Sequence, residues 1–423
     1  MRINLSSGPR KVAFLAVFLV AVTLYIGAIF YHNLAVRLGA RSDPGSLAQA
    51  VHLEPWNAEP NWKLGRYLLF VAQDPTHAVF RLGVAVRLNP YVAKYWLDLA
   101  SAYHVSGEVQ HQRSALEHAL GAEPTDPNVA WQAANFYLVQ DDLARALPLF
   151  RVVMNNDSEL LNSALRLCWR ATQNVQVMLN EAIPAEPEPY FGFLSLLTNL
   201  GKTSSAEEVW RRLLSLGHGF PLVDAYPYFD YLIKNHQIAA AEQVWQQLVH
   251  RDRELQTYSQ PGNLIVDGGF ERDFLNGGFD WRYTVIDPVQ LSIDTGEFQS
   301  GSQSLRINFK GPGVDDIGIL EYVPVQPNTQ YHFSVYTKAQ DVESASGPRL
   351  SVADAYSGES YVLTDDSLGT TGWRQQMADF RTGPQTSLLT VKAARVPGSP
   401  LIKGTFWIDD VKLVRVERKG DSS

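Results

Sequence analysis

Three pairs of adjacent aspartates in the last third of the sequence could do acid–base chemistry on a glycosidic bond: Asp315-Asp316, Asp365-Asp366 and Asp409-Asp410. A glycosidase needs two carboxyl groups that face one bond across roughly 5–10 Å. Adjacent residues of a strand point to opposite faces of a sheet, so the last pair is not expected to share a cleft. The sequence also lacks G-x-S-x-G, H-E-x-x-H and P-loop motifs. We therefore expect that the protein is not an enzyme.

Tyrosines close to acidic residues form a second group that could bind a ligand. An aromatic ring can stack on the C–H face of a sugar, and a carboxylate can accept hydrogen bonds from its hydroxyl groups. Tyr331 shares its strand parity with apolar neighbours, whereas Tyr336 has the opposite parity and should look onto the outer face. The predicted sugar-binding residues are Tyr336, Tyr356 and Tyr361, with Asp354 and Glu359 as polar partners. Alternatively, these are ordinary strand residues that only pack.

The last third of the chain alternates apolar and polar residues, which is typical of half-buried strands. Gly, Pro, Asn and Asp separate the runs. Two such segments bracket this region: Asn263-Leu-Ile-Val-Asp-Gly-Gly-Phe-Glu271 at its start and Phe406-Trp-Ile-Asp-Asp-Val-Lys-Leu413 at its end. The number of candidate strands predicts an all-β sandwich of two sheets over residues 262–418.

These bracketing segments, with Ser300-Gly-Ser-Gln-Ser-Leu305 and Gly372-Trp373 between them, resemble carbohydrate-binding modules of families four and nine. Those modules are jelly rolls of the galactose-binding-like kind. The resemblance implies that Trp281, Trp373 and Trp407 pack inside the fold. It does not by itself imply that a sugar is bound.

The same resemblance implies a structural calcium ion near the joined chain ends. Calcium takes oxygen ligands, and binding tethers the segments that supply them. Glu271 and Asp410 match the family's ligand positions, and Gln299 stands where the family often has a stronger ligand. The alternative is that both carboxylates are solvated or salt-bridged.

An internal repeat runs through the middle of the chain. Ala50–Pro55, Ala85–Pro90 and Ala119–Pro124 end in prolines that are 35 and 34 residues apart. The segment from Trp96 to Tyr103 fits the W-x2-L-[GA]-x2-Y pattern of tetratricopeptide repeats. We identify residues 44–256 as tetratricopeptide-like helical repeats, in which pairs of helices stack into a solenoid.

An uncharged apolar segment, Val12 to Tyr31, precedes the repeats. As a helix it would reach roughly 30 Å, enough to cross a bilayer core. Basic residues flank it: Arg2, Arg10 and Lys11 before it, and Arg37 and Arg41 further out after it. This bias favours a cytoplasmic tail of residues 1–11 and an uncleaved transmembrane signal anchor in the inner membrane, with the bulk of the chain in the periplasm. A cleaved signal peptide is the alternative, although its apolar core is usually shorter.

Length and composition bound the remaining possibilities. A chain of 423 residues exceeds one ordinary domain. The formal net charge is −8 and neither folded part is basic, which argues against nucleic acid as a partner. Because Cys168 is the only cysteine, the sequence excludes an intrachain disulfide and a thiolate metal cluster.

Together these observations predict a non-catalytic, membrane-anchored adaptor of a bacterial envelope. We expect its repeats to bind a protein partner and its sandwich to bind a polysaccharide or other glycan, by analogy in exopolysaccharide assembly or export. The alternative is a pure protein–protein scaffold whose sandwich is structural and binds no sugar.

Overall fold

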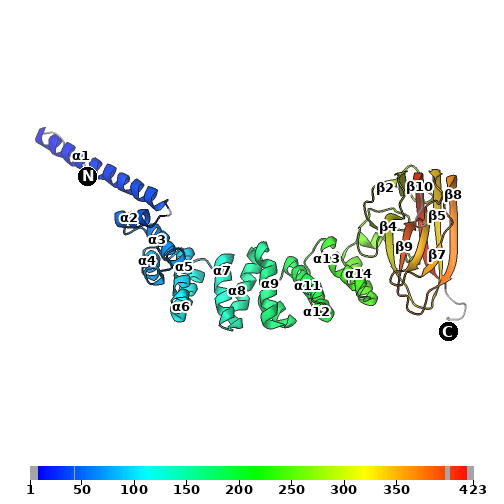
Figure 1. Cartoon of the computed structure of the whole chain (residues 1–423), viewed down its shortest axis with the longest axis horizontal. Helices are drawn as coiled ribbons and strands as arrows, with labels where there is room; N and C mark the ends of the chain where they lie inside the picture. Colours follow the sequence, from blue (N-terminus) through cyan, green and yellow to red (C-terminus); the bar gives the residue numbers. More distant parts are fainter. Residues whose placement is uncertain (1–7, 42, 396–400, 417–423) are drawn as a thin grey trace. The chain divides into compact units, whose positions relative to one another are not determined.

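The computed structural model describes residues 8–41, 43–395 and 401–416. The chain divides into two compact units, Met1–His218 and Gly219–Ser423. The first unit is helical, and the second contains two helices followed by strands (Figure 1). The predicted fold class is confirmed: a long apolar N-terminal helix, a helical repeat region and a C-terminal all-β sandwich.

The first unit opens with α1 (Gly8–Gly39), which contains the predicted span. The helices that follow are α2 (Pro44–Leu53), α3 (Ala58–Phe70), α4 (Pro75–Leu88), α5 (Ala93–Val105), α6 (Val109–Ala122), α7 (Pro127–Val139), α8 (Leu143–Asn156), α9 (Ser158–Thr172), α10 (Val175–Val177), the π-helical turn η1 (Met178–Ala182), α11 (Pro187–Asn199) and α12 (Thr203–Ser215). Asp74 and Asp126 each accept a hydrogen bond from the first turn of the following helix, which begins with a proline. Both features favour a helix start.

Small residues let the helices of a repeat approach closely. A Cβ atom on Gly65 of α3 would lie 2.6 Å from Cγ of Leu82 on α4, so only glycine fits there. Ala100 and Ala134, at similar places in the next repeats, are also buried. The repeat pattern weakens where η1 interrupts the series of helices.

The second unit begins with α13 (Leu222–Lys234), α14 (Ile238–Arg251) and the short 3₁₀ helix η2 (Leu255–Thr257). Its strands are β1 (Arg282–Tyr283), β2 (Val289–Asp294), β3 (Ser304–Gly311), β4 (Asp316–Pro324), β5 (Gln330–Glu343), β6 (Arg349–Asp354), β7 (Ser360–Leu363), β8 (Gly369–Arg381), β9 (Leu388–Ala394) and β10 (Ile402–Arg415). They form two antiparallel five-stranded sheets, β1-β4-β9-β6-β7 and β2-β3-β10-β5-β8.

The sandwich core confirms the burial predicted for Tyr331 from strand parity and for Trp281 and Trp407 from the family resemblance. Tyr331 and Trp281 are each 1% exposed, and Trp407 is buried as well. Trp373 is only half-buried. The parity argument for Asp409 and Asp410 assumed a regular strand, and this assumption was wrong. The strand β10 has a bulge between Asp409 and Lys412, and Asp410 has φ +49°.

The helices α13 and α14 share a core with the loop that leads into β1. Phe279 is 3% exposed, and its ring centroid lies 4.8 Å from that of Phe229 on α13 and 6.1 Å from that of Trp245 on α14. Gly278 has φ +60°, and a Cβ atom there would lie 2.0 Å from the Trp245 ring. The domain bounds predicted from the sequence, 44–256 and 262–418, divide the chain where helices give way to strands. The second compact unit starts earlier, at Gly219, because it includes α13 and α14.

Two buried carboxyl groups, Asp280 and Glu321, lie in this part of the second unit, and both are 0% exposed. Burial raises the pKa of Asp280 to about 7 against the opposing hydrogen bonds from the N–H groups of Leu275 and Trp281, and it raises the pKa of Glu321 as well. In the described part of the chain, Oδ1 of Asp280 and Oε2 of Glu321 have no hydrogen-bond partner. Both groups are therefore better accommodated as neutral acids than as carboxylates.

This burial predicts that the Asp280→Asn variant responds less to pH than the wild type. An unfolded Asp titrates near pH 4, so between about pH 4 and 7 the folded state binds more protons than the unfolded state. The contribution of Asp280 to stability is complete below pH 4 and is lost as the pH rises through 7. Between pH 4 and 7, the wild type should therefore lose about 2–4 kcal/mol more of its unfolding free energy than the Asp280→Asn variant loses. Denaturant titrations at pH 4.5 and 7.5 measure this, and parallel losses in both proteins would contradict it.

Candidate functional site

The five residues predicted to bind sugar do not gather in one place. Tyr336 lies on β5, opposite Asp409 and Gln375, on the outer face of the sheet β2-β3-β10-β5-β8. Asp354, Tyr356, Glu359 and Tyr361 lie on or between β6 and β7 of the other sheet. The two groups therefore belong to different sheets.

Asp354 and Tyr356 make contacts within the protein. Asp354 accepts hydrogen bonds from the N–H groups of Tyr356 and Ser357 at 2.8 and 2.7 Å; although burial opposes it, these bonds lower the pKa of Asp354. The Tyr356 hydroxyl donates to the carbonyl of Ile233 at 2.7 Å, and its ring stacks on His236 at 3.7 Å between centroids. Tyr356 thus attaches the sheet to the end of α13.

Tyr361 and Glu359 are also part of an internal network. The Tyr361 hydroxyl lies 2.7 Å from Oγ1 of Thr386, accepts a bond from the N–H of Gly383 and donates to Glu359. Its ring stacks on Phe380 at 5.3 Å. These contacts give Tyr361 a structural role at the edge of the sheet, and a role in sugar binding stays a prediction.

The two predicted calcium ligands, Glu271 and Asp410, are each engaged with hydrogen-bond donors. Glu271 accepts from the backbone N–H and the hydroxyl of Ser302 at 2.8 and 2.6 Å. Asp410 lies 2.7 Å from the ammonium group of Lys412. Its neighbour Asp409 accepts from the N–H groups of Gln299 and Ser300. Across the described residues, no group of three or more acidic, histidine or cysteine side chains could hold a metal ion. Backbone carbonyl oxygens or waters, which calcium also accepts as ligands, would have to complete a site around Glu271 and Asp410, and the ion stays a prediction.

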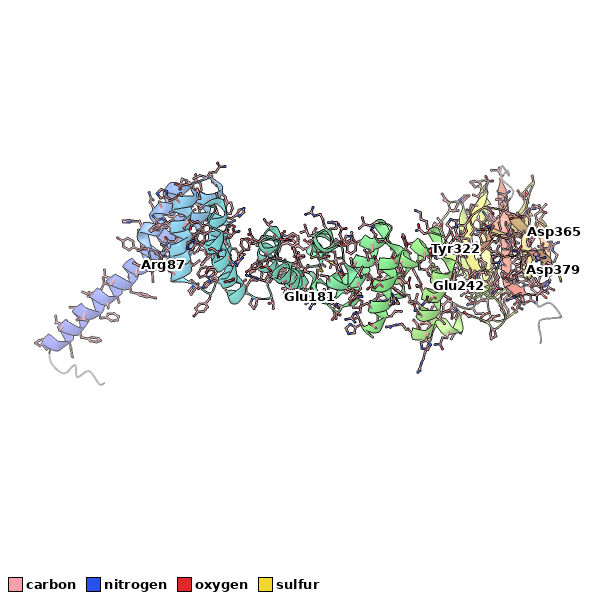
Figure 2. The ribbon with its side chains drawn as sticks, turned by 90° about the horizontal axis from the view of Figure 1, so that it is seen from below. Arg87, Glu181, Glu242, Tyr322, Asp365 and Asp379 are labelled. Atoms are coloured by element: carbon pink, nitrogen blue, oxygen red, sulfur yellow. The ribbon has the colours of Figure 1, made fainter. Side chains whose placement is uncertain are left out.

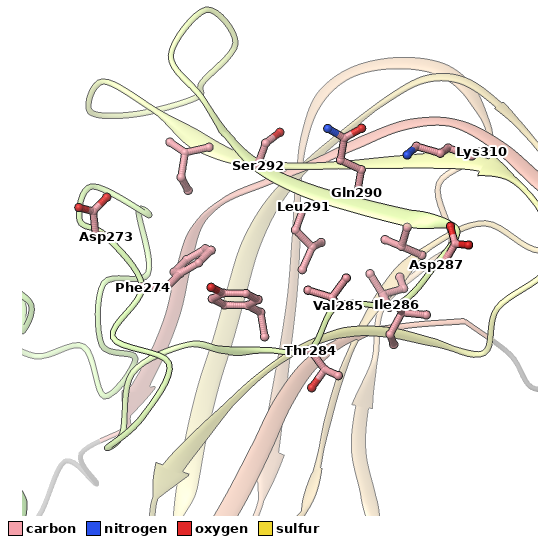
Figure 3. A pocket seen from close by; sticks show the side chains of 14 residues that line it. Asp273, Phe274, Thr284, Val285, Ile286, Asp287, Gln290, Leu291, Ser292 and Lys310 are labelled. Atoms are coloured by element: carbon pink, nitrogen blue, oxygen red, sulfur yellow. The ribbon is translucent and has the colours of Figure 1, made fainter. Parts of the chain in front are cut away.

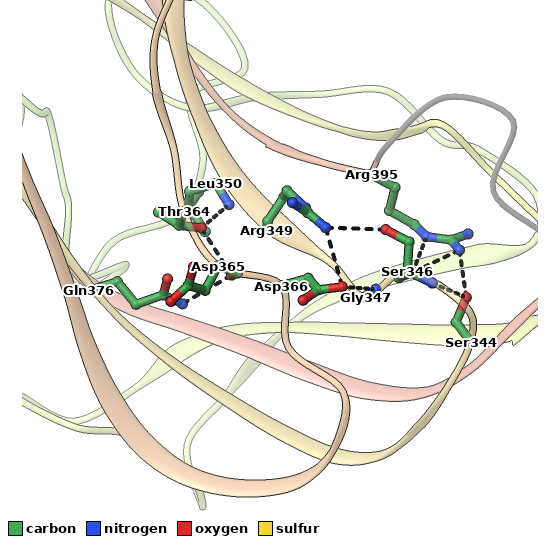
Figure 4. Close-up of polar contacts among 10 residues, drawn as sticks. All are labelled: Ser344, Ser346, Gly347, Arg349, Leu350, Thr364, Asp365, Asp366, Gln376 and Arg395. Atoms are coloured by element: carbon green, nitrogen blue, oxygen red, sulfur yellow. Dashed lines mark hydrogen bonds and ion pairs between the residues drawn. The ribbon is translucent and has the colours of Figure 1, made fainter.

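In the acidic pair Asp365-Asp366, the second carboxylate makes structural contacts. Asp366 pairs with Arg349 at 3.2 Å and accepts from the N–H of Gly347, while the buried Arg395 holds the same loop through Ser344 and Ser346 (Figure 4). Asp365, labelled on the sandwich in Figure 2, is exposed. The carboxylate of Asp366 therefore joins its own loop to the segment of Gly347 and Arg349.

The structure instead reveals a cavity of about 830 Å³ along one edge of the sandwich. The segment from Tyr283 to Asp287, the strand β2 and the loop residues Asp273 and Phe274 line it. In Figure 3, Phe274 and Leu291 point into this space, whereas Gln290 and Ser292, which also belong to its lining, project from the opposite side of β2. Its size and mainly apolar lining with a few polar groups are those of small-molecule sites. We call it the edge pocket.

Tyr283 and Phe274 supply the aromatic rings of the edge pocket, and backbone hydrogen bonds hold the segment that carries Tyr283. The ring centroids of Phe274 and Tyr283 lie 6.0 Å apart. The N–H of Tyr283 donates to the side chain of Asn276 at 3.0 Å, and that of Thr284 donates to the carbonyl of Gly318 at 2.7 Å. Tyr283 remains 41% exposed, so its ring is accessible to a ligand.

Charged groups complete the edge pocket. The carboxylates of Asp273 and Asp287 and the ammonium group of Lys310 belong to its lining. The two carboxylates could accept hydrogen bonds from the hydroxyl groups of a polar ligand, and the ammonium group could donate one to them. Tyr283 was not among the predicted sugar-binding residues, and the sequence also missed Phe274 and Asp273. These two lie outside any strand, where no periodicity predicts their direction.

No protein-family model matches this chain. Exochitinase 1 of Streptomyces olivaceoviridis is 29% identical over 157 residues, which are 36% of this chain and 21% of the exochitinase. The chain thus spans about a fifth of the length of that relative.

Solved structures similar to parts of the chain include the protein MamA, at 16% identity and a TM-score of 0.27 over 41% of this chain and 86% of MamA. A family-four carbohydrate-binding module is also similar, at 13% identity and a TM-score of 0.28 over 36% of this chain and 99% of the module. In its own elements, the chain has tetratricopeptide-like helical repeats followed by a sandwich like that of a carbohydrate-binding module.

Proposed function

We propose that this chain is a non-catalytic adaptor, anchored in a membrane by α1, that binds glycan through the edge pocket of its sandwich and a protein partner through its helical repeats. The observation that carries the proposal is the edge pocket itself. It offers an exposed tyrosine ring beside Phe274, with carboxylate and amide groups in its lining. An aromatic face with surrounding hydrogen-bonding groups suits a sugar ring.

The anchor is supported by the continuous helix α1, whose apolar part has a mean hydropathy of 2.6 and is long enough to span a bilayer. We place the folded units on the periplasmic side, following the flanking charges. Protease added to intact spheroplasts should digest both units. If it cuts only the N-terminal tail, the orientation is the reverse.

A glycan array probed with the detergent-solubilised full chain tests the proposal. We expect retention on at least one class of polysaccharide, without release of reducing sugar. If no glycan is retained, the alternative gains support: a protein–protein scaffold with a structural sandwich. Release of reducing ends would instead indicate a polysaccharide-cleaving enzyme.

We propose calcium as a structural ion that joins the segment of Glu271 to Asp410 of β10. If it binds, chelation with EDTA should lower the melting temperature of the sandwich, because ion binding stabilises only the folded state. The Glu271→Gln variant should start with a lower melting temperature and respond less to EDTA. A wild-type melting curve that EDTA leaves unchanged would remove calcium from the account.

A further inference from the structure

The membrane helix enters the folded unit without a linker. Its apolar part ends at Tyr31, but α1 continues as one helix to Gly39. In this continuation Ala35 is 1% exposed, and the carbonyl of Gly39 accepts a hydrogen bond from the ammonium group of Lys63 at 3.0 Å. The first repeat is therefore packed directly against the end of the span.

The corner between α2 and α3, residues 54–57, lies beside the first polar residue after the span. His32 follows Tyr31 in α1, and its Nδ1 lies 2.7 Å from Oε1 of Glu54. The other oxygen of Glu54 accepts a bond from the Asn57 side chain at 2.8 Å, which holds the corner in shape. Because one helical residue advances only about 1.5 Å along the axis, this corner stands at the level where the apolar span ends.

Trp56 occupies this corner and is 72% exposed. Among the residues that the structure describes, it is the only tryptophan whose side chain is largely exposed. An indole ring of this size is favoured at the boundary of a bilayer, where its apolar body and its N–H group meet different surroundings. In water the same ring would leave a large apolar surface unburied.

The repeat provides matched positions elsewhere in the same unit. Trp56, Tyr91 and Thr125 each follow the proline that ends one repeat, and all three are exposed. The first of these corners contacts α1 next to the span, through Glu54 and His32. Trp56 therefore shares its position in the repeat with Tyr91 and Thr125. It differs from them because its corner contacts His32 of α1 through Glu54.

We infer that the corner of residues 54–57 is a second membrane contact, in which Trp56 lies in the lipid headgroup layer and fixes the first repeat on the bilayer surface. The partner is the membrane that α1 itself spans, so the inference rests on the proposed anchor. The basic residues Arg37 and Arg41, further along the chain, are of the charge that anionic headgroups attract.

Fluorescent labels on single cysteines test this inference. The full-length variants Trp56→Cys, Tyr91→Cys and Thr125→Cys are labelled with an environment-sensitive maleimide and reconstituted into vesicles that contain headgroup spin-labelled lipid. Cys168 should not react, because it is fully buried and burial raises its pKa to about 12. The unsubstituted chain serves as the blank for labelling.

We expect the label at position 56 to lose about twice as much fluorescence as the labels at positions 91 and 125, because only the first corner reaches the headgroups. Equal quenching at the three positions, in a chain that co-floats with the vesicles, would overturn the membrane contact and leave the anchor in place. A chain that does not co-float would overturn the anchor, and this inference with it. All three positions are exposed, so these substitutions remove no core packing.

Discussion

Replacing Phe279 with Ala will lower the free energy of unfolding of the second unit by about 3–5 kcal/mol, the usual cost of deleting a buried phenylalanine ring. The ring lies between Phe229 of α13 and Trp245 of α14, so its loss leaves a cavity where the helices meet the sandwich. Denaturant titration of the full chain, followed by hydrogen exchange in peptides from each unit, measures the effect where it arises.

The matched control for this substitution is Phe298→Ala, because Phe298 is 41% exposed and belongs to the same unit. We expect it to cost less than about 1 kcal/mol. Protection should fall in α13, α14 and the sandwich together for the Phe279 variant. A loss confined to the strands, or a cost as small as that of the control, would mean that the helices do not share the core of the sandwich.

Replacing Tyr283 with Ala will weaken glycan binding by about ten- to thirtyfold, which corresponds to about 1.5–2 kcal/mol. The substitution removes the accessible ring of the edge pocket and leaves Phe274 without its aromatic neighbour. Because Tyr283 is partly exposed at the end of a two-residue strand, the fold should lose little stability. Isothermal titration of the full chain with a glycan retained on the array gives both affinities.

Tyr336→Ala is the control that separates the two candidate sites. Tyr336 was predicted from the sequence and lies on the outer face of the sheet that contains β5. If the edge pocket binds the glycan, this variant keeps the affinity of the wild type. A large loss in Tyr336→Ala, with little change in Tyr283→Ala, would move the site to that face.

The fold was predictable because its signals are local. The 34-residue period and the change to a period of two residues depend only on neighbours in sequence, and they located the helices and the strands. The parity of Tyr331 and Tyr336 was predicted correctly for the same reason. The bulge at Asp410, where the backbone is left-handed, was not predicted. It lies beside Asp409, which accepts hydrogen bonds from Gln299 and Ser300, and no pattern of neighbouring residues reveals contacts so distant in sequence.

The edge pocket was not predictable, because it is built from segments that carry no periodic pattern. Phe274 and Asp273 lie in an irregular loop, and Lys310 and Ile317 come from β3 and β4. Tyr356, between β6 and β7, and Tyr361, on β7, were equally suitable by residue type. Only the fold shows that Tyr356 bonds to Ile233 and that Tyr361 bonds to Thr386.

Hydrogen exchange of the full chain with and without a retained oligosaccharide tests the glycan-binding claim most directly. We predict that the ligand slows exchange in residues 273–293, which line the edge pocket, and leaves the peptides of β5 and β8 unchanged. Slowed exchange along β5 and β8 alone, with residues 273–293 unaffected, would contradict the account.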